Sequence, residues 1–279
     1  APLVLKTFKT NLGKTPYEIF DEFNANSVNA ASIGQVHLAV KNNKKLAVKI
    51  QYPGVADSIS SDLAMVKPIA VRMFNLQGQD SDKYFKEVED KLIEETDYLL
   101  EMKQSVEVVA ACKKIDNLVF PEYYPEFSSE KIITMDWMTG LHLSEFTKIN
   151  TDREKARKVG QALWDFYMYQ IHVLKKVHAD PHPGNFLVDK EDRLVALDFG
   201  CMKQIPNDFY NPYFELIDKK IINDPKIFNS KLFELEILRP DDTKQEISYF
   251  TELFYDLLSL FTKPFQEESF DFSDETFFE

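Results

Sequence analysis

The sequence predicts an α+β fold of two lobes, in which a small β-containing N-lobe carries helical insertions and the C-lobe is mainly helical. Two strand-like apolar segments, residues 33–40 and 45–51, flank a short polar turn early in the chain. Two long segments, 82–112 and 152–177, instead have the composition and apolar spacing of helices. At 279 residues, with 44% apolar side chains, the chain can bury a sizeable core, and its length suits either one large domain or two lobes.

The N-lobe is expected over residues 1–137. A short helix is expected over 15–23, because Thr15-Pro16 places an N-cap residue before a proline at the first helical position. Pro53-Gly54 ends the second strand of the hairpin. The further N-lobe elements are a helical region at 55–77, a polar loop at 77–82, the long helix of 82–112, and strands at 118–121 and 131–137.

The C-lobe is expected over residues 138–279. The helix of 152–177 is its first long element, and strands at 186–188 and 194–197 form a hairpin. Beyond Met202 the chain is rich in Phe and helical in pattern.

Three oxygen-bearing side chains lie around this second hairpin at a characteristic spacing. Asp180 lies five residues before Asn185, and Asn185 lies thirteen before Asp198, which opens the sequence Asp-Phe-Gly. Protein kinases space their catalytic Asp, metal-binding Asn and Asp-Phe-Gly aspartate in nearly this way. Mg²⁺ on a nucleotide requires such hard oxygen ligands, with the phosphates supplying the remaining charge. The spacing therefore predicts a kinase-like site for ATP or ADP with Mg²⁺.

Two other interpretations of the same residues stay open. The segment of residues 180–185 is also typical of tight turns, since proline fixes φ and Gly or Asn tolerates the left-handed region. In an extended segment, His178, Asp180 and His182 would share one side and could hold the metal of a metallohydrolase. The prolines interrupt regular strand geometry, however, and a metallohydrolase leaves the Asp-Phe-Gly sequence unexplained.

Lys49 lies inside the apolar segment of residues 46–50. A lysine in a buried strand is costly unless its ammonium group is paired. In protein kinases a lysine in such a strand contacts the α- and β-phosphates and pairs with a glutamate of the αC helix. The alternative is a lysine on an edge strand whose ammonium reaches water. Its position upstream of Asp180 and Asn185 favours the first interpretation.

Three segments carry a resemblance to a known family. Residues 29–37 have alanines where a kinase phosphate loop has glycines, and residues 49–55 and 178–186 match in the expected order. Over about residues 16–202 the sequence resembles the UbiB family of atypical kinase-like proteins, the aarF-domain-containing kinase group. The resemblance implies an atypical protein-kinase-like two-lobed fold, with ATP or ADP and Mg²⁺ as cofactors.

The resemblance also implies a role for each matching residue. Ala30, Ala31 and Ser32 would form the alanine-rich nucleotide loop, and Lys49 would contact the phosphates. Met135, Trp137 and Met138 lie at the expected hinge, where the backbone would bind adenine, unless this is an ordinary core strand and turn. The remaining roles are catalysis by Asp180, metal binding by Asn185 and Asp198, pairing with Lys49 by Glu101, and site lining by Glu95 and Asp97.

Glu95 and Glu101 both lie in the expected helix of 82–112. Six residues on one helix correspond to a net rotation of about 240°, so both cannot point straight at Lys49. We expect Glu101 to be the partner of Lys49. For Glu95 the alternative is the ordinary solvated face of an acidic helix.

The sequence departs from the family pattern in two places. The Lys-x-Gly-Gln segment that precedes the alanine-rich loop is absent, and Leu12-Gly13-Lys14 does not match it. The chain also lacks the hydrophobic C-terminal helices of many members, and we expect it to be a fragment of a longer protein.

These features predict a Mg²⁺-dependent ATPase or small-molecule phosphotransferase. Activity on proteins is not expected, because no Ala-Pro-Glu motif follows Gly200. The resemblance links the chain to isoprenoid quinone (ubiquinone-type) biosynthesis, with a lipid or quinone-precursor ligand and a quinone-biosynthetic protein complex as partners. The alternative is a nucleotide-sensing pseudokinase or scaffold without turnover, because every metal ligand would serve binding as well as catalysis.

Composition limits the remaining classes. The net charge of −13 argues against nucleic-acid binding and against attraction to anionic lipid surfaces. The sequence contains no run of eighteen apolar residues, so it predicts no transmembrane helix.

The two cysteines, Cys112 and Cys201, exclude a disulfide framework and suit a reducing compartment. We expect a cytoplasmic location, with membrane association in the full-length protein. Cys201 directly follows Gly200, so it either lines the nucleotide pocket or is a small buried side chain.

Overall fold

A computed structural model describes residues 2–31, 33–73, 79–179, 181–266, 268–274 and 277, with the backbone alone for 79–81 and 219. The chain forms two compact units, Ala1–Gln204 and Ile205–Glu279. The boundary expected between residues 137 and 138 lies inside the first unit and stays a prediction.

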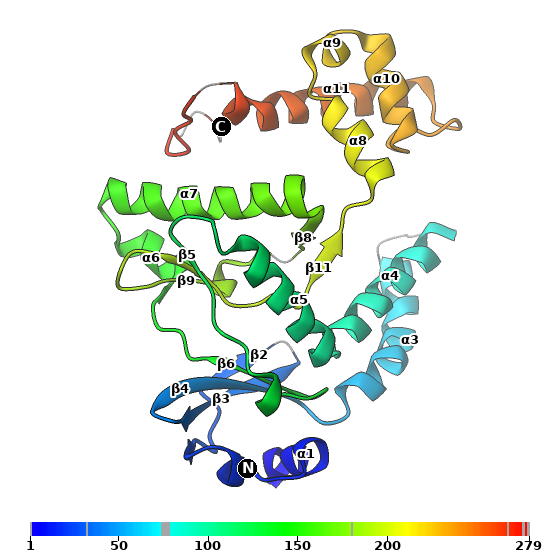
Figure 1. Cartoon of the computed structure of the whole chain (residues 1–279). Helices are drawn as coiled ribbons and strands as arrows, with labels where there is room; N and C mark the ends of the chain where they lie inside the picture. Colours follow the sequence, from blue (N-terminus) through cyan, green and yellow to red (C-terminus); the bar gives the residue numbers. More distant parts are fainter. Residues whose placement is uncertain are drawn as a thin grey trace. The chain divides into compact units, whose positions relative to one another are not determined.

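The first unit contains a five-stranded antiparallel sheet in the order β1-β3-β4-β6, with β2 paired to β3. Figure 1 shows this sheet in blue to green, near the N-terminus of the chain. The predicted hairpin is confirmed, since β3 and β4 pair along their whole length. The strands are β1 (Glu22–Phe23), β2 (Asn29–Ala31), β3 (Gly34–Lys41), β4 (Lys44–Gln51) and β6 (Ile132–Asp136).

The two faces of β4 follow the period-two alternation of a strand. Leu46, Val48 and Ile50 are buried in one core, which helix α1 (Pro2–Leu12) covers with Val4 and Phe8. Lys49 and Gln51 point to the other face, where they contact Glu101 and Thr96 respectively. The alternation alone therefore directs the Lys49 side chain away from the apolar core.

The helix expected over 15–23 is shorter in the structure. Helix α2 covers only Pro16–Ile19, although Thr15 is its N-cap as expected and also forms a capping box with Glu18. Glu22–Phe23 instead pairs with β3, and the Phe23 ring stacks on Phe20. Packing among the aromatic rings of this core thus overrides the local helical pattern.

The long helix expected over 82–112 is two helices, and this expectation was wrong. Helix α3 (Val55–Met73) precedes helix α4 (Gln79–Glu95), and α5 (Tyr98–Cys112) follows after a break at Thr96-Asp97. Asp97 is the N-cap of α5, where its side chain accepts a hydrogen bond from the Leu100 N–H. Gln51 of β4 donates to the Thr96 carbonyl at 2.9 Å, which ties the break to the sheet. Figure 1 shows α4 and α5 as separate ribbons.

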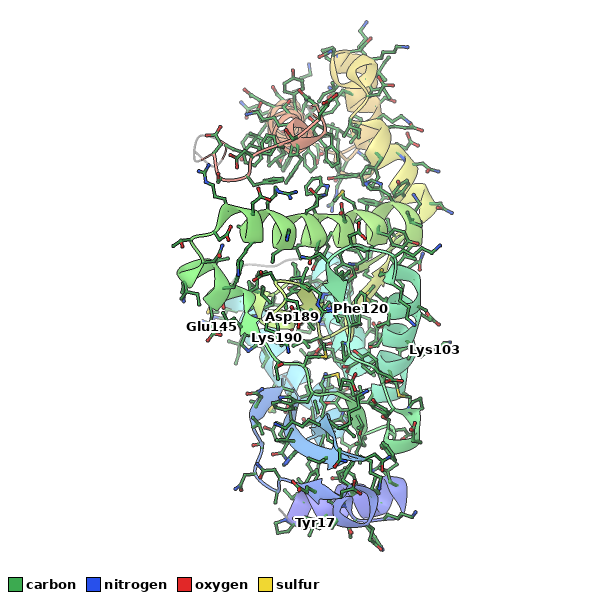
Figure 2. The ribbon with its side chains drawn as sticks, turned by 60° about the vertical axis from the view of Figure 1, so that its left-hand side comes forward. Tyr17, Lys103, Phe120, Glu145, Asp189 and Lys190 are labelled. Atoms are coloured by element: carbon green, nitrogen blue, oxygen red, sulfur yellow. The ribbon has the colours of Figure 1, made fainter. Side chains whose placement is uncertain are left out.

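A second core in the same unit lies around helix α7 (Arg153–Tyr169). Phe166 and Phe199 are both about 1% exposed there, and Phe120 packs edge-on against Phe166. Phe120 is partly buried, and Figure 2 labels it below α7 in that view. The sheet of this part has the order β5-β10-β9-β7. Its elements are β5 (Leu118–Val119), β7 (Leu141–His142), α6 (Leu143–Ile149), the 3₁₀ turn η3 (Pro183–Asn185), β9 (Phe186–Val188) and β10 (Leu194–Ala196). The 3₁₀ turn η1 (Pro125–Phe127) belongs to the first core, where Phe127 packs against Phe20.

The helix expected to continue to residue 177 ends earlier. After Tyr169 the chain makes a π-helical turn, η2 (Gln170–Leu174), and Lys175 takes a left-handed φ of 52°. The turn buries Gln170 completely, and its side-chain oxygen accepts a hydrogen bond from the His178 N–H at 2.8 Å. His178 belongs to β8 (Lys176–His178), which pairs with β11 (Met202–Gln204). The π-turn thus ends the helix, and the chain continues as strand β8, which precedes residues 180–185.

The second unit is helical, as the sequence predicted beyond Met202. Its buried side chains Leu216, Phe228 and Leu232 form a core of its own. The helices are α8 (Asn207–Glu215), α9 (Lys219–Ile222), α10 (Pro225–Glu234), α11 (Lys244–Thr262) and the 3₁₀ turn η4 (Lys263–Phe265). Across the described residues, none of the helices combines the length and the apolar character needed to span a membrane.

Two glycine-to-alanine substitutions in the first unit should act in opposite directions. A Cβ at Gly140 would lie 2.5 Å from the backbone oxygen of Val188, whereas a Cβ at Gly160 in α7 would meet nothing within 4 Å. We expect Gly140→Ala to lower the free energy of unfolding by about 1–3 kcal/mol, because the backbone must move. Gly160→Ala should raise it by about 0.5–1 kcal/mol, because alanine loses less entropy in a helix.

Calorimetric unfolding of both variants measures the difference. At roughly 2–4 °C per kcal/mol, their melting temperatures should lie on opposite sides of the unsubstituted chain. Equal shifts would mean that β7 does not pack against β9 as closely as described.

Candidate active site

Lys49 forms an ion pair with Glu101 of α5. Its Nζ atom lies 2.9 Å from Oε1 and 3.1 Å from Oε2 of that carboxylate. The two side chains are only 13% and 9% exposed, so water screens the pair weakly. The structure thus brings together the lysine and the glutamate that the sequence favoured as its partner.

Asp198 is the second carboxylate beside Lys49. Its Oδ2 atom lies 3.5 Å from Lys49 Nζ, and its Oδ1 atom accepts a hydrogen bond from the Gly200 N–H at 2.8 Å. The next residue, Phe199, is buried in the core beneath α7 and fixes the chain at this point. Gly200 lies so near the carboxylates that an added Cβ would be 3.3 Å from Asp198 Oδ1 and 3.4 Å from Glu101 Oε2.

The charges of these three groups depend on one another. Burial opposes the Lys49 ammonium, but Asp198 and Glu101 outweigh burial and raise the pKa of Lys49. Burial would also raise the pKa of Asp198, yet Lys49 and the Gly200 N–H hold it below its ordinary value. For Glu101 burial dominates and raises the pKa to about 7, although Lys49 acts in the opposite direction. Glu101 is therefore the carboxylate that takes up a proton first.

These residues surround a small cavity with about 50 Å³ open to water. That volume holds one or a few water molecules. Its walls are Ile33, Lys49, Glu95, Glu101, His178, Asn185, Asp198, Gly200 and Cys201. An ammonium fixed by carboxylates, next to a partly open carboxylate and a side-chain amide, is suited to binding a phosphate group together with a cation.

Glu95 and Glu101 both line this cavity, which a single helix would not have allowed. Glu95 ends α4 and Glu101 lies in the first turn of α5, so the break between the helices removes the 240° rotation. Asp97 was expected to line the site, but it is exposed and serves as the cap of α5. The break at Thr96-Asp97 therefore decides which acids of these helices line the cavity.

The residues expected to form the nucleotide loop lie in a tight hairpin. Ala30 and Ala31 belong to β2 and pair with Gln35 and Gly34 of β3. Ile33 is the residue of this turn that reaches the cavity. Ser32 lies outside the described residues.

The expected hinge residues do not reach this cavity. Met135 is half-buried in β6 opposite Ala47 of β4, and the Trp137 N–H donates to the Lys45 carbonyl at 3.0 Å. Met138 is half-buried just beyond the strand. Their proposed contact with adenine stays a prediction.

Asn185 lines the cavity as the sequence expected of a metal ligand, whereas Asp180 lies outside the described residues. The tight-turn interpretation also holds locally, since residues 183–185 form a 3₁₀ turn and the His182 Nδ1 accepts from the Gly184 N–H. Within the described part of the chain, no three His, Cys, Asp or Glu side chains gather in a way that could hold a metal ion. The metallohydrolase alternative includes Asp180 and therefore lies outside the described residues.

The sequence analysis missed the importance of Tyr98. Its ring lies beside Lys49, with the ammonium 5.0 Å from the ring centroid, and the residue is fully buried. It is one of twelve tyrosines, and no pattern in a single sequence distinguishes it from the others. Cys201 does line the cavity, which was one of the two positions considered for it.

Comparison with known proteins identifies the family of the chain. The profile of the ABC1 atypical kinase-like domain matches residues 2–230, and the chain belongs to this family. The atypical kinase COQ8 of Saccharomyces cerevisiae mitochondria is 28% identical over 97% of this chain and 54% of its own length. An uncharacterised chloroplastic aarF domain-containing protein kinase of Arabidopsis thaliana is 29% identical over 89% of this chain and 35% of its own.

A solved structure shows the same fold. The complex of Rv3197 with erythromycin, from Mycobacterium tuberculosis, superimposes with a TM-score of 0.71 and 25% identity over 95% of this chain and 66% of that one. The predicted α+β kinase-like fold and the resemblance to the UbiB family are thereby confirmed. The chain spans about a third to a half of the length of the curated relatives named above.

Replacing Glu101 with glutamine should change how stability depends on pH. The carboxyl has a pKa near 7 in the folded chain, against about 4.3 when unfolded. Between these values the folded state binds more protons, so this group lowers stability as pH rises, by at most about 1.4 kcal/mol per pH unit. The glutamine amide cannot titrate. The stability advantage of the unsubstituted chain over Glu101→Gln should therefore shrink from pH 5 to pH 8.

Urea unfolding of both proteins across this range measures the advantage. Glu107→Gln is the matched control, because Glu107 is a more exposed acid of the same helix. A difference that stays constant with pH would show that Glu101 keeps an ordinary carboxyl pKa.

Proposed function

We propose that this member of the ABC1 atypical kinase-like family binds ATP or ADP together with Mg²⁺ in the cavity around Lys49. The observation that carries the proposal is the Lys49–Glu101 ion pair, which lies beside Asp198 in a cavity that Asn185 also lines. Lys49 would contact the phosphates, and Glu101 would hold the ammonium in place.

The charge of the cavity favours nucleotide that arrives with a cation. When all groups are ionised, Lys49 contributes +1 and Glu95, Glu101 and Asp198 contribute −3, which gives a net charge of −2. A polyphosphate alone would be repelled at such close range. A divalent cation bound between the carboxylates and the phosphates removes this repulsion, and this is the chemistry that Mg²⁺ would supply.

The residues present fit such a cation. Asp198 and Asn185 offer a carboxylate and an amide oxygen, the hard ligands that Mg²⁺ prefers. The Asp198 side chain is 38% exposed toward the cavity, and its present contacts with Lys49 and Gly200 leave lone pairs for a further ligand.

The cavity must open before a whole nucleotide can enter. About 50 Å³ is far below the roughly 300–1,000 Å³ of sites for ligands of this size. Ile33, in the turn between β2 and β3, is the wall residue contributed by the expected nucleotide loop. We infer that residues 29–31 and 33–34 change position when the phosphates bind.

ATP hydrolysis, or phosphate transfer to a small molecule, is the reaction that we propose. Asp180 would orient the attacking water or hydroxyl, and this role rests on its place five residues before Asn185. The chain after Gly200 supports a small substrate, because it enters β11 at Met202 and helix α8 begins at Asn207. This short path leaves little room for a peptide-docking segment.

The link to isoprenoid quinone biosynthesis is the most specific part of the proposal. It rests on the UbiB resemblance and on the likeness to COQ8. A lipid or quinone-precursor substrate and a quinone-biosynthetic protein complex would follow from it.

Mg²⁺ with ADP or ATP should stabilise the folded chain. At a hundredfold excess over the dissociation constant, mass action adds about 2.7 kcal/mol to the free energy of unfolding. The melting temperature should rise by several degrees, at roughly 2–4 °C per kcal/mol. Differential scanning calorimetry with and without Mg²⁺ measures this shift, and the absence of a shift with every purine nucleotide would refute the site.

Asp198→Asn tests the metal ligand in the same assay. The substitution should remove the dependence of binding on Mg²⁺ and leave the chain folded. Asp189→Asn is the control, because Asp189 lies outside this cavity and its largely buried carboxylate pairs with Arg193. An unchanged Mg²⁺ requirement in Asp198→Asn would reassign Asp198 to a structural turn.

Turnover separates the enzyme from the pseudokinase or scaffold alternative. Steady release of ADP that is lost in Asp180→Asn is expected of an enzyme, whereas tight binding without release is expected of a scaffold. Strong phosphorylation of a peptide library by the unsubstituted chain would contradict the small-molecule substrate.

A further inference from the structure

Tyr98 buries a hydroxyl group that has no hydrogen-bond partner among the described residues. The side chain is 0% exposed, at the start of helix α5. Its surroundings also raise the pKa of the phenol, mainly because burial disfavours the charged form, so the group stays a neutral donor. A buried hydroxyl without a partner is unfavourable, and a phenylalanine of the same shape would avoid that penalty.

The hydroxyl lies against the end of the expected nucleotide loop. A Cβ added at Gly34 would be 2.4 Å from the Ile50 backbone oxygen and 2.9 Å from the Tyr98 hydroxyl oxygen, so the hydroxyl lies close to the Gly34 backbone and a larger residue there would displace its neighbours. Gly34 is the first residue of β3 and pairs with Ala31 across the turn. The hydroxyl therefore reaches the backbone of the segment that would have to move when phosphates bind.

The ring of the same side chain lies beside the lysine of the site. Lys49 Nζ is 5.0 Å from the ring centroid, within the range of a cation–π contact. Tyr98 follows the cap residue Asp97 by one position, and Glu101 lies one helical turn further on. One rigid side chain thus touches both elements that would hold the phosphates, the loop and the lysine.

A second tyrosine near the site shows the contrast. The Tyr123 hydroxyl donates to the Leu197 carbonyl at 3.2 Å, so its polar group has a partner in the chain as it stands. The Tyr98 hydroxyl has none among the described residues, although Tyr98 is the more deeply buried of the two side chains.

We propose that Tyr98 is a positioning residue whose hydroxyl acquires its hydrogen bond only when nucleotide is bound, by donating to a backbone carbonyl of residues 29–31, 33 or 34. This bond would hold the nucleotide loop over the phosphates in a fixed relation to Lys49. The inference rests on the proposed nucleotide site and adds to it a residue that couples α5 to the loop.

Tyr98→Phe tests the proposal because it removes only the hydroxyl. Without nucleotide, the variant should melt at the same temperature as the unsubstituted chain or higher, since no hydrogen bond is lost. Its dissociation constant for Mg²⁺-ADP, measured by titration calorimetry, should rise about tenfold, the loss expected for one hydrogen bond. In hydrogen exchange, Mg²⁺-ADP should protect amides of residues 29–35 in the unsubstituted chain and protect them less in the variant.

Tyr123→Phe is the matched control. It should lower the melting temperature of the nucleotide-free chain, because its hydrogen bond to Leu197 is lost, and it should leave Mg²⁺-ADP affinity within about twofold.

The outcomes separate this inference from the proposed function. If the unsubstituted chain does not bind Mg²⁺-ADP, the proposed function fails first. If it binds and Tyr98→Phe binds equally well, the function stands and the positioning role is refuted. A Tyr98→Phe chain that melts lower or does not fold would show that the hydroxyl already has a partner without nucleotide, which also overturns the proposal.

Discussion

The need to keep the Lys49 ammonium charged inside the protein constrains the rest of the first unit. A lysine in the middle of a buried strand is stable only with carboxylates close by. The chain supplies Glu101 from 52 residues away and Asp198 from 149 residues away. Helix α5 and the segment after β10 must therefore meet β4 at one point, and the ion pair holds them there.

Several local interactions fix the point at which α5 and the Asp198 segment meet β4. Gln51, two residues beyond Lys49 on the same face of β4, binds the Thr96 carbonyl and so fixes where α5 begins. Phe199 anchors the Asp198 segment in the core beneath α7. Gly200 has no Cβ, which lets its backbone lie against both carboxylates. Each feature is an ordinary packing or capping interaction, and together they set the distances from Lys49 to its two carboxylates.

Burial in this arrangement is energetically unfavourable for the Glu101 carboxylate and for the Tyr98 hydroxyl. Burial raises the pKa of Glu101 to about 7, whereas the pKa of Asp198 is lowered. Glu101 is therefore protonated at a higher pH than Asp198. The Tyr98 hydroxyl is left without a partner in the described residues. Groups buried in this way are typical of functional sites, where a ligand supplies the interaction that is missing. Both features indicate a site in which a bound ligand would supply the missing charge and hydrogen-bond interactions.

The sequence by itself determined the β3–β4 hairpin, the direction of Lys49 away from the core, and the convergence of Asn185 and Asp198, because strand alternation and the length of a hairpin are local properties. It also favoured Glu101 as the partner of Lys49. It did not reveal the break at Thr96-Asp97, because a capping aspartate inside an acidic helical pattern looks like any other acid. The π-turn after Tyr169 was equally hidden, since it depends on Gln170 reaching the backbone of His178 eight residues later. Only the tertiary structure decided which acids reach the cavity and that Tyr98 lies between the loop and the lysine, because contacts between distant segments have no periodic signal in one sequence.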